Sequence, residues 1–199
     1  MTQAQGAQRP QDLPKLGNWM PGVAGEQIFS AAECDRIIAL RDEMKDAQAE
    51  GAPGNAGSDQ LRKSRICWVQ PSQEHNWLFG KLAQVCQQVN QQHFAMELFG
   101  FTEPLQISEY GEGSFFDWHM DMGNGKNSVR KLSFVVQLSD PRDYEGGNLE
   151  IMSGPQPYAF PRTRGAMILF PSFVMHRVTP VTSGTRMSAV GWIGGPHIR

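Results

Sequence analysis

The feature that most constrains the fold is a series of short segments with two-residue hydrophobic periodicity, which begins near residue 103. Apolar and polar residues alternate in these segments, and β-branched and aromatic residues are frequent, as expected for strands with one buried face. Stretches rich in Gly, Asn, Asp and Pro separate them and favour turns. The pattern predicts seven or eight strands, which comprise LQISEY, FFDWH, KLSFVVQL, NLEIM, AMILF, VMHRV and RMSAVGWI.

Two helical patterns precede the strands. Ser30 and Glu33 form a capping box, and the apolar stripe that follows predicts a helix that ends at Gly51. A second stripe predicts a helix over Trp77–Leu98, with Gly100 as its stop. Helices followed by strands indicate an α+β fold, in which a β-sandwich or jelly roll carries two N-terminal helices on one sheet.

The remaining segments suggest the domain boundaries. Residues 1–25 are polar and contain Gly and Pro, so we expect a flexible tail, followed by a single domain over 26–199 with its β core at about 103–195. Residues 51–60 form a loop of small residues. The next stretch, RKSRICWVQ, predicts one strand that Pro71 closes.

Composition excludes several functional classes. The chain has 199 residues, 40% of them hydrophobic, and a net charge of −2, so we expect no nucleic-acid partner. It lacks a long apolar run and a secretory leader, which predicts no membrane segment and a cytoplasmic location. Three widely spaced cysteines, Cys34, Cys67 and Cys86, are typical of buried, reduced thiols.

Three residues of the β region form a candidate metal site. His119 and Asp121 are two apart in FFDWHMD, and residues i and i+2 of a strand point to the same face. His176 is at the end of another predicted strand. Two imidazoles and one carboxylate form the ligand set of non-haem Fe(II) oxygenases, whereas histidines alone or with cysteine would favour zinc.

Arg186 is the fourth candidate. It follows His176 by ten positions, so a hairpin centred on Val181 would place the two residues opposite each other. A guanidinium near a metal can bind a carboxylate through two charge-assisted hydrogen bonds. The alternative is an exposed salt bridge, which is common and contributes little.

The segments HMD, GGNLEI and LFPSFVMHRVTPVTSGTR together resemble the 2-oxoglutarate/iron(II)-dependent dioxygenases, specifically their prolyl 4-hydroxylase-like branch. The resemblance covers residues 100–195 and, more loosely, 26–99 through LRKSRICWV. It implies a double-stranded β-helix of eight strands and an Fe(II) ion bound by the three candidate ligands. It also implies that Arg186 holds the distal carboxylate of the cosubstrate 2-oxoglutarate, with Tyr110 and Gln137 as further candidates for that pocket.

The same resemblance implies the reaction. O2 and 2-oxoglutarate are consumed, succinate and CO2 are released, and an unactivated C–H bond is hydroxylated, with ascorbate as a candidate reductant. The expected substrate is a prolyl or similar residue in a peptide or protein, with Arg130, Trp192 and Phe116 at the substrate positions. Loops 51–60 and 122–129 are candidate lids.

Three alternatives remain open at this point. A hydroxylase of a free amino acid or other small molecule would need buried partners for both charges, which Arg65, Asp117 and Arg130 could supply. A zinc hydrolase would ignore 2-oxoglutarate, and a non-catalytic metal-binding β-sandwich module would bind metal only. For Asp117, which shares the face of His119, we expect a hydrogen bond to a ligand. The sequence does not indicate an oligomeric state.

Overall fold

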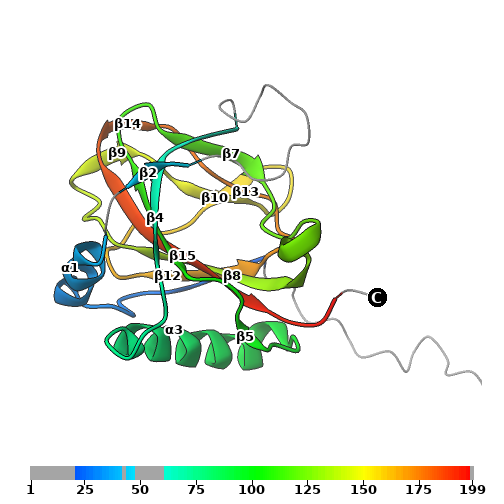
Figure 1. Cartoon of the computed structure of the whole chain (residues 1–199). Helices are drawn as coiled ribbons and strands as arrows, with labels where there is room; N and C mark the ends of the chain where they lie inside the picture. Colours follow the sequence, from blue (N-terminus) through cyan, green and yellow to red (C-terminus); the bar gives the residue numbers. More distant parts are fainter. Residues whose placement is uncertain (1–20, 42–43, 48–60, 198–199) are drawn as a thin grey trace, which may run out of the picture.

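A computed structural model describes residues 21–41, 44–47 and 61–197, so most of the predicted tail and the loop 51–60 lie outside the described residues. The fold is built on a major and a minor antiparallel sheet (Figure 1). The major sheet has the strand order β1-β12-β8-β15-β6-β4-β2, with β5 beside β15. Its strands are β1 (Val23–Gly25), β2 (Lys45–Asp46), β4 (Arg65–Val69), β5 (Gly100–Phe101), β6 (Leu105–Tyr110), β8 (Arg130–Gln137), β12 (Met167–Pro171) and β15 (Arg186–Gly194).

The minor sheet has the strand order β11-β10-β13-β7-β3. Its strands are β3 (Arg62–Lys63), β7 (Phe115–His119), β10 (Leu149–Met152), β11 (Pro157–Ala159) and β13 (His176–Val178), and a separate pair joins β9 (Tyr144–Gly146) to β14 (Val181–Gly184). The chain passes between the sheets several times, for example from β12 to β13 and on to β15. The predicted double-stranded β-helix, or jelly roll, with an α+β composition is confirmed.

Both helices cover one face of the major sheet, as predicted. Figure 1 shows α1 (Ala31–Ala39) and α3 (Asn76–Val89) on the side of the molecule opposite β7, β10 and β13. One apolar cluster joins both helices to the major sheet, and it includes Ile37, Leu82 and Phe134. A second, smaller cluster lies between the two sheets and includes Leu149 and Phe170.

The major-sheet strands have two buried faces of opposite character. On β8, Leu132, Phe134 and Val136 belong to the cluster beneath the helices. Ser133 and Gln137 alternate with them and are equally buried, but face the interior between the sheets. Buried polar residues also alternate with apolar ones on β6 and β15, so polar side chains adjoin the apolar cluster between the sheets.

The first helix is shorter than predicted. Its capping box is present, with the Ser30 backbone N–H donating to Glu33 Oε2 and the Glu33 N–H donating to Ser30 Oγ. The helix nevertheless ends at Ala39, and Lys45–Asp46 forms β2, which pairs with β4. Hydrogen bonding at the edge of the sheet thus overrides local helix propensity.

The second helix also stops early. After α3 the chain makes a π-helical turn over Asn90–Phe94, and Ala95 adopts the left-handed conformation. The buried Asn90 side chain donates to the Met96 carbonyl and accepts from the Met96 N–H. These two side-chain bonds replace helical backbone bonds and end the helix before Gly100. Gly100 is therefore not the helix stop, and it begins β5.

One strand prediction and the boundary of the predicted tail also need correction. RKSRICWVQ is not one strand, because β3 pairs with β7 of the minor sheet and β4 pairs with β6 of the major sheet. The predicted tail reached residue 25, but Val23–Gly25 pairs with β12 and is part of the major sheet. Strands that precede residue 103 therefore extend the β core towards the N-terminus.

The predicted hairpin between His176 and Arg186 is wrong. β13 pairs with β7 and β10, β14 pairs with β9, and β15 pairs with β6 and β8. His176 and Arg186 therefore stand on different sheets, and they approach each other across the interior of the jelly roll.

No helix in the described ranges combines the length and apolar character that a membrane crossing needs. The three cysteines are buried and form no disulfide, as the sequence predicted.

The packing of α3 gives the first testable prediction. Leu82 is fully buried in the cluster beneath the major sheet, so Leu82→Ala should lower the free energy of unfolding by about 2–5 kcal/mol. Gln84→Ala on the exposed face of the same helix should change it by less than about 0.5 kcal/mol. Urea unfolding followed by circular dichroism measures both. A loss at Leu82 as small as that at Gln84 would contradict this packing.

Candidate metal centre

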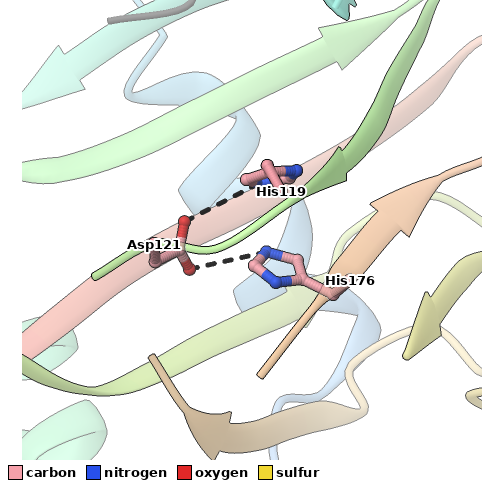
Figure 2. A group of neighbouring side chains, drawn as sticks. All are labelled: His119, Asp121 and His176. Atoms are coloured by element: carbon pink, nitrogen blue, oxygen red, sulfur yellow. Dashed lines mark ion pairs between the residues drawn. The ribbon is translucent and has the colours of Figure 1, made fainter. Parts of the chain in front are cut away.

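Three side chains from the predicted set converge at one end of the minor sheet. His119 ends β7, His176 begins β13, and the two residues are paired in the ladder between these strands. Asp121 lies two residues beyond β7. Its Oδ1 is 3.7 Å from His119 Nε2 and its Oδ2 is 3.5 Å from His176 Nε2, as the dashed lines in Figure 2 show.

Backbone carbonyls fix the orientation of both imidazoles. His119 Nδ1 lies 2.7 Å from the carbonyl oxygen of Asp117, and His176 Nδ1 lies 2.9 Å from that of Val174. A carbonyl oxygen only accepts, so each Nδ1 carries a proton, and in the neutral imidazole Nε2 then has a free lone pair. Both lone pairs are thereby available on the side that faces Asp121. The bond expected from the Asp117 side chain comes instead from its backbone.

Two serines hold the Asp121 carboxylate. The Ser133 hydroxyl on β8 donates to Asp121 Oδ2 at 2.6 Å, and the Ser172 hydroxyl lies 2.9 Å from that of Ser133. The Ser172 carbonyl also accepts from the backbone N–H groups of Asp121 and Met122. The turn after β12 and the middle of β8 thus orient the carboxylate, which neither spacing nor motif had indicated.

The protonation states suit metal binding. Burial and the nearby His176 lower the pKa of His119 to about 3, so its imidazole is neutral near neutral pH. Burial alone would raise the pKa of Asp121, but the two imidazoles and the Ser133 hydroxyl outweigh burial and lower it. His119 therefore presents a neutral nitrogen donor and Asp121 an anionic oxygen donor near neutral pH.

This donor set fits Fe(II). The three ligand atoms lie within 4.8 Å of one another, and the 3.5–3.7 Å separations exceed hydrogen-bonding distance. Two imidazoles and one carboxylate on one side of an ion leave its other positions open. This group is the metal-ligand cluster of His, Cys, Asp and Glu found among the described residues.

Arg186 lies across the interior from the cluster and is almost fully buried, with 1% of its surface exposed. Its Nη2 donates to Gln137 Oε1 at 2.9 Å and its Nη1 to Ser188 Oγ at 3.3 Å. Its Nε is buried with no hydrogen-bond partner, and no described carboxylate pairs with it. A buried guanidinium with only neutral partners is costly unless an anion completes the site.

Arg186 and the metal cluster line the same inner cavity. Tyr110 lines it as well, with its ring centre 5.3 Å from the Arg186 guanidinium carbon. Gln137 does not line the cavity, but it holds Arg186 through the hydrogen bond described above. The structure thus brings Tyr110, Arg186 and the three metal-site residues together, with Gln137 behind them.

A wider groove of about 370 Å³ continues outward from this cavity. Phe116, Arg130 and Trp192, the predicted substrate residues, all line it. The Phe116 ring is stacked on His119, with ring centres 3.4 Å apart. The Arg130 guanidinium lies over the Trp192 ring at 3.8 Å.

Arg130 already has partners for its charge. Its Nε and Nη2 donate to the two carboxylate oxygens of Glu103 at 2.5 and 2.6 Å, and its Nη1 donates to the Asp121 carbonyl. The pair is buried, which favours a fixed position for Arg130. Glu103 was not predicted as a site residue, since it marked only the start of the strand region.

Some other predicted residues are elsewhere. Arg65 is exposed and paired with Glu109, and the Asp117 side chain accepts from the Trp118 N–H. Of the candidate lids, residues 125–129 form a short 3-10 helix, and Lys126 and Asn127 line the groove. The other candidate lid, 51–60, lies outside the described residues.

Comparison with known sequences agrees with this geometry. Residues 105–194 match the model of the 2OG-Fe(II) oxygenase superfamily. A PKHD-type hydroxylase of Hyphomonas neptunium is 40% identical over 121 residues, which are 57% of this chain and 54% of the relative. One from a Synechococcus species is 42% identical over 90 residues, 45% of this chain and 40% of the relative. The chain therefore spans about half the length of these curated relatives, or less.

Solved structures share the fold. A Pseudomonas putida prolyl-4-hydroxylase has a TM-score of 0.65 at 22% identity, and the match covers 88% of this chain and 93% of the hydroxylase chain. A Trichoplax adhaerens prolyl hydroxylase, solved with a hypoxia-inducible factor peptide fragment, has a TM-score of 0.68 at 14% identity and covers 88% and 84%. At these identities the likeness establishes the jelly-roll fold.

The geometry of the cluster predicts the effect of removing a ligand. His176→Ala or Asp121→Ala should abolish stoichiometric Fe(II) binding, because each removes one of three donors. The exposed His93 provides a matched control, and His93→Ala should retain the metal. Anaerobic equilibrium dialysis with metal analysis measures the content of each variant, and circular dichroism verifies folding. Full metal content in His176→Ala would refute the ligand assignment.

Proposed function

We propose that the chain is a 2-oxoglutarate-dependent dioxygenase that hydroxylates an unactivated C–H bond, because residues 105–194 match the model of the 2OG-Fe(II) oxygenase superfamily. The proposed substrate is a prolyl or similar residue in a peptide or protein, and succinate and CO2 are the proposed coproducts. The observation that carries the proposal is the buried Arg186, whose charge no described residue neutralises, in one cavity with two histidines and an aspartate.

His119, Asp121 and His176 would hold Fe(II). When bound, the ion together with 2-oxoglutarate and O2 supplies the oxidising power that hydroxylation of an unactivated C–H bond requires. The protein holds the three metal-binding side chains in position. The Asp117 and Val174 carbonyls keep both imidazoles in the metal-binding tautomer, and Ser133 orients the Asp121 carboxylate.

Arg186 would anchor the distal carboxylate of 2-oxoglutarate. Gln137 and Ser188 already bond two of its nitrogens, so the guanidinium is held before any ligand arrives. Such preorganisation reduces the entropic cost of binding. Tyr110 stands beside Arg186 in the same cavity, and apolar side chains of Val135, Leu149 and Val190 exclude water around it.

The substrate would occupy the wider groove. Phe116 and Trp192 supply aromatic surface on its walls, which suits the apolar ring of a prolyl residue. An open groove also admits an extended chain on either side of the target residue. The solved prolyl hydroxylases that share this fold, one of them solved with a peptide fragment, support the same choice.

A hydroxylase of a free amino acid is the second candidate. Arg130, one of the residues expected to pair with such a substrate, is already neutralised by Glu103, and Arg65 is exposed. The rival functions of zinc hydrolysis and metal binding alone provide no role for the buried Arg186. Ascorbate as a reductant and a cytoplasmic location remain predictions.

Arg186 gives a direct test of cosubstrate binding. Arg186→Gln should weaken 2-oxoglutarate binding by about 100-fold or more, because a buried carboxylate would lose its charged partner. Arg142→Gln, at an exposed arginine paired with Asp140, should leave the affinity within about twofold. Anaerobic calorimetric titration of the Mn(II)-loaded proteins measures both. Unchanged affinity in Arg186→Gln would contradict the proposed function.

The substrate class is tested by turnover. With Fe(II), O2 and 2-oxoglutarate, the protein should release succinate in step with a product heavier by one oxygen atom when it is given proline-containing peptides. Mass spectrometry of the peptides and a succinate assay measure the coupling. Coupled turnover of free L-proline without turnover of any peptide would instead favour the amino-acid hydroxylase.

A further inference from the structure

A second buried arginine, Arg62, lies where the inner cavity meets the wider groove and lines both. Only 8% of its surface is exposed. It stands on β3, where it pairs in the ladder with Phe116, and its guanidinium carbon lies 4.6 Å from the centre of the Phe116 ring. Because that ring is stacked on His119, the charge of Arg62 is one aromatic ring away from the metal cluster.

The Arg62 side chain has one hydrogen bond and no ion pair among the described residues. Its Nε donates to the Ser64 hydroxyl at 2.7 Å, while its Nη2 is buried and has no hydrogen-bond partner. No carboxylate among the described residues forms an ion pair with it. Ser64 is neutral and cannot offset the desolvation of a guanidinium. Arg62 is therefore a buried cation beside the cavity and the groove, and none of the described residues bonds its Nη2.

Comparison with Arg130 shows that the missing ion pair distinguishes Arg62. Both arginines line the same groove, and each stacks on an aromatic ring. Arg130 is neutralised by both carboxylate oxygens of Glu103 and bonds a backbone carbonyl in addition. Arg130 is therefore a positioning residue that fixes Trp192 and the backbone of Asp121, whereas the charge of Arg62 remains available for a ligand.

We propose that Arg62 binds a carboxylate carried by the substrate, close to the C–H bond that is hydroxylated. The inference rests on the proposed function and adds a specificity determinant to it. A planar guanidinium with a free edge suits a carboxylate, which it can bind through two parallel hydrogen bonds. Arg186 lines only the inner cavity and supplies the inner anion site, whereas Arg62 lines both spaces and supplies a separate site where they meet.

The same carboxylate chemistry has two possible sources. It is either the side chain of an Asp or Glu that flanks the target residue in a peptide, or the α-carboxylate of a free amino acid. Both sources place a negative charge near the reacting carbon, and different probes separate them.

Thermal unfolding of the metal-free protein tests whether the Arg62 charge serves the fold. Arg62→Met removes an unpaired buried charge, so its melting temperature should equal or exceed that of the wild type. Arg130→Met is the matched control at the same groove. It leaves Glu103 buried without its partner and should lower the melting temperature by at least about 4 °C. An equal loss in both variants would assign Arg62 to the fold and overturn the proposal.

Binding measurements then identify the ligand. The Mn(II)- and 2-oxoglutarate-loaded protein is titrated anaerobically with two pools of proline-centred peptides, flanked by Asp and Glu or by Asn and Gln. L-proline and L-prolinamide form the second pair of probes. The wild type should bind the acidic member of one pair at least about tenfold more tightly. Arg62→Gln should abolish that preference, and Arg62→Lys should retain part of it.

The outcomes separate this proposal from the function on which it rests. If the wild type does not prefer either acidic probe, or if Arg62→Gln keeps the preference, the proposal is wrong. It is also wrong if Arg62→Gln loses 2-oxoglutarate affinity as Arg186→Gln does, because Arg62 would then belong to the cosubstrate site. Failure of the wild type to bind 2-oxoglutarate at all would instead remove the proposed function.

Discussion

The constraint on which the site depends is a guanidinium buried inside the jelly roll without a carboxylate among the described residues. Arg186 stands on β15, a strand that is buried on both faces, and its neighbours Gln137 and Ser188 provide only neutral bonds. Such an arrangement is unfavourable in isolation. The apolar packing on the other face of β15 compensates for this cost. That face belongs to the cluster that joins the major sheet to α1 and α3. The fold thus stores an unsatisfied positive charge where an anion can bind.

The two sheets contribute different parts of the site. The minor sheet and the residues after β7 supply the three candidate metal ligands, while the major sheet supplies Arg186 and Ser133, whose hydroxyl bonds the Asp121 carboxylate. His119 and His176 stand on hydrogen-bonded strands, and Asp121, which lies beyond β7, is held by Ser133 and Ser172. The groove outside the cavity contains two further arginines. Glu103 neutralises Arg130, whereas Arg62 has no ion pair among the described residues.

Much of this could be predicted from the sequence, because it depends on local pattern. Period-two segments identified the main strands, and the i, i+2 spacing of His119 and Asp121 predicted that both face one ion, although β7 ends at His119 and Asp121 lies beyond it. Pairing between distant segments could not be predicted in the same way. The stretch 62–70 divides between two sheets, and His176 and Arg186 meet across the interior and not across a hairpin. The partners of each arginine depend on that pairing, so only the structure distinguishes the neutralised Arg130 from Arg62.

The central claim is that the metal cluster and Arg186 form one site for one ligand, which carries a keto acid at one end and a carboxylate at the other. Anaerobic absorption titration of the Fe(II)-loaded protein tests it by comparing 2-oxoglutarate with pyruvate, which has the same keto acid but no distal carboxylate. We predict that 2-oxoglutarate produces visible charge-transfer absorption that saturates near one equivalent. Pyruvate should require a concentration at least about 100-fold higher, because it forms no ion pair with Arg186. Equal affinity for the two acids would contradict the account.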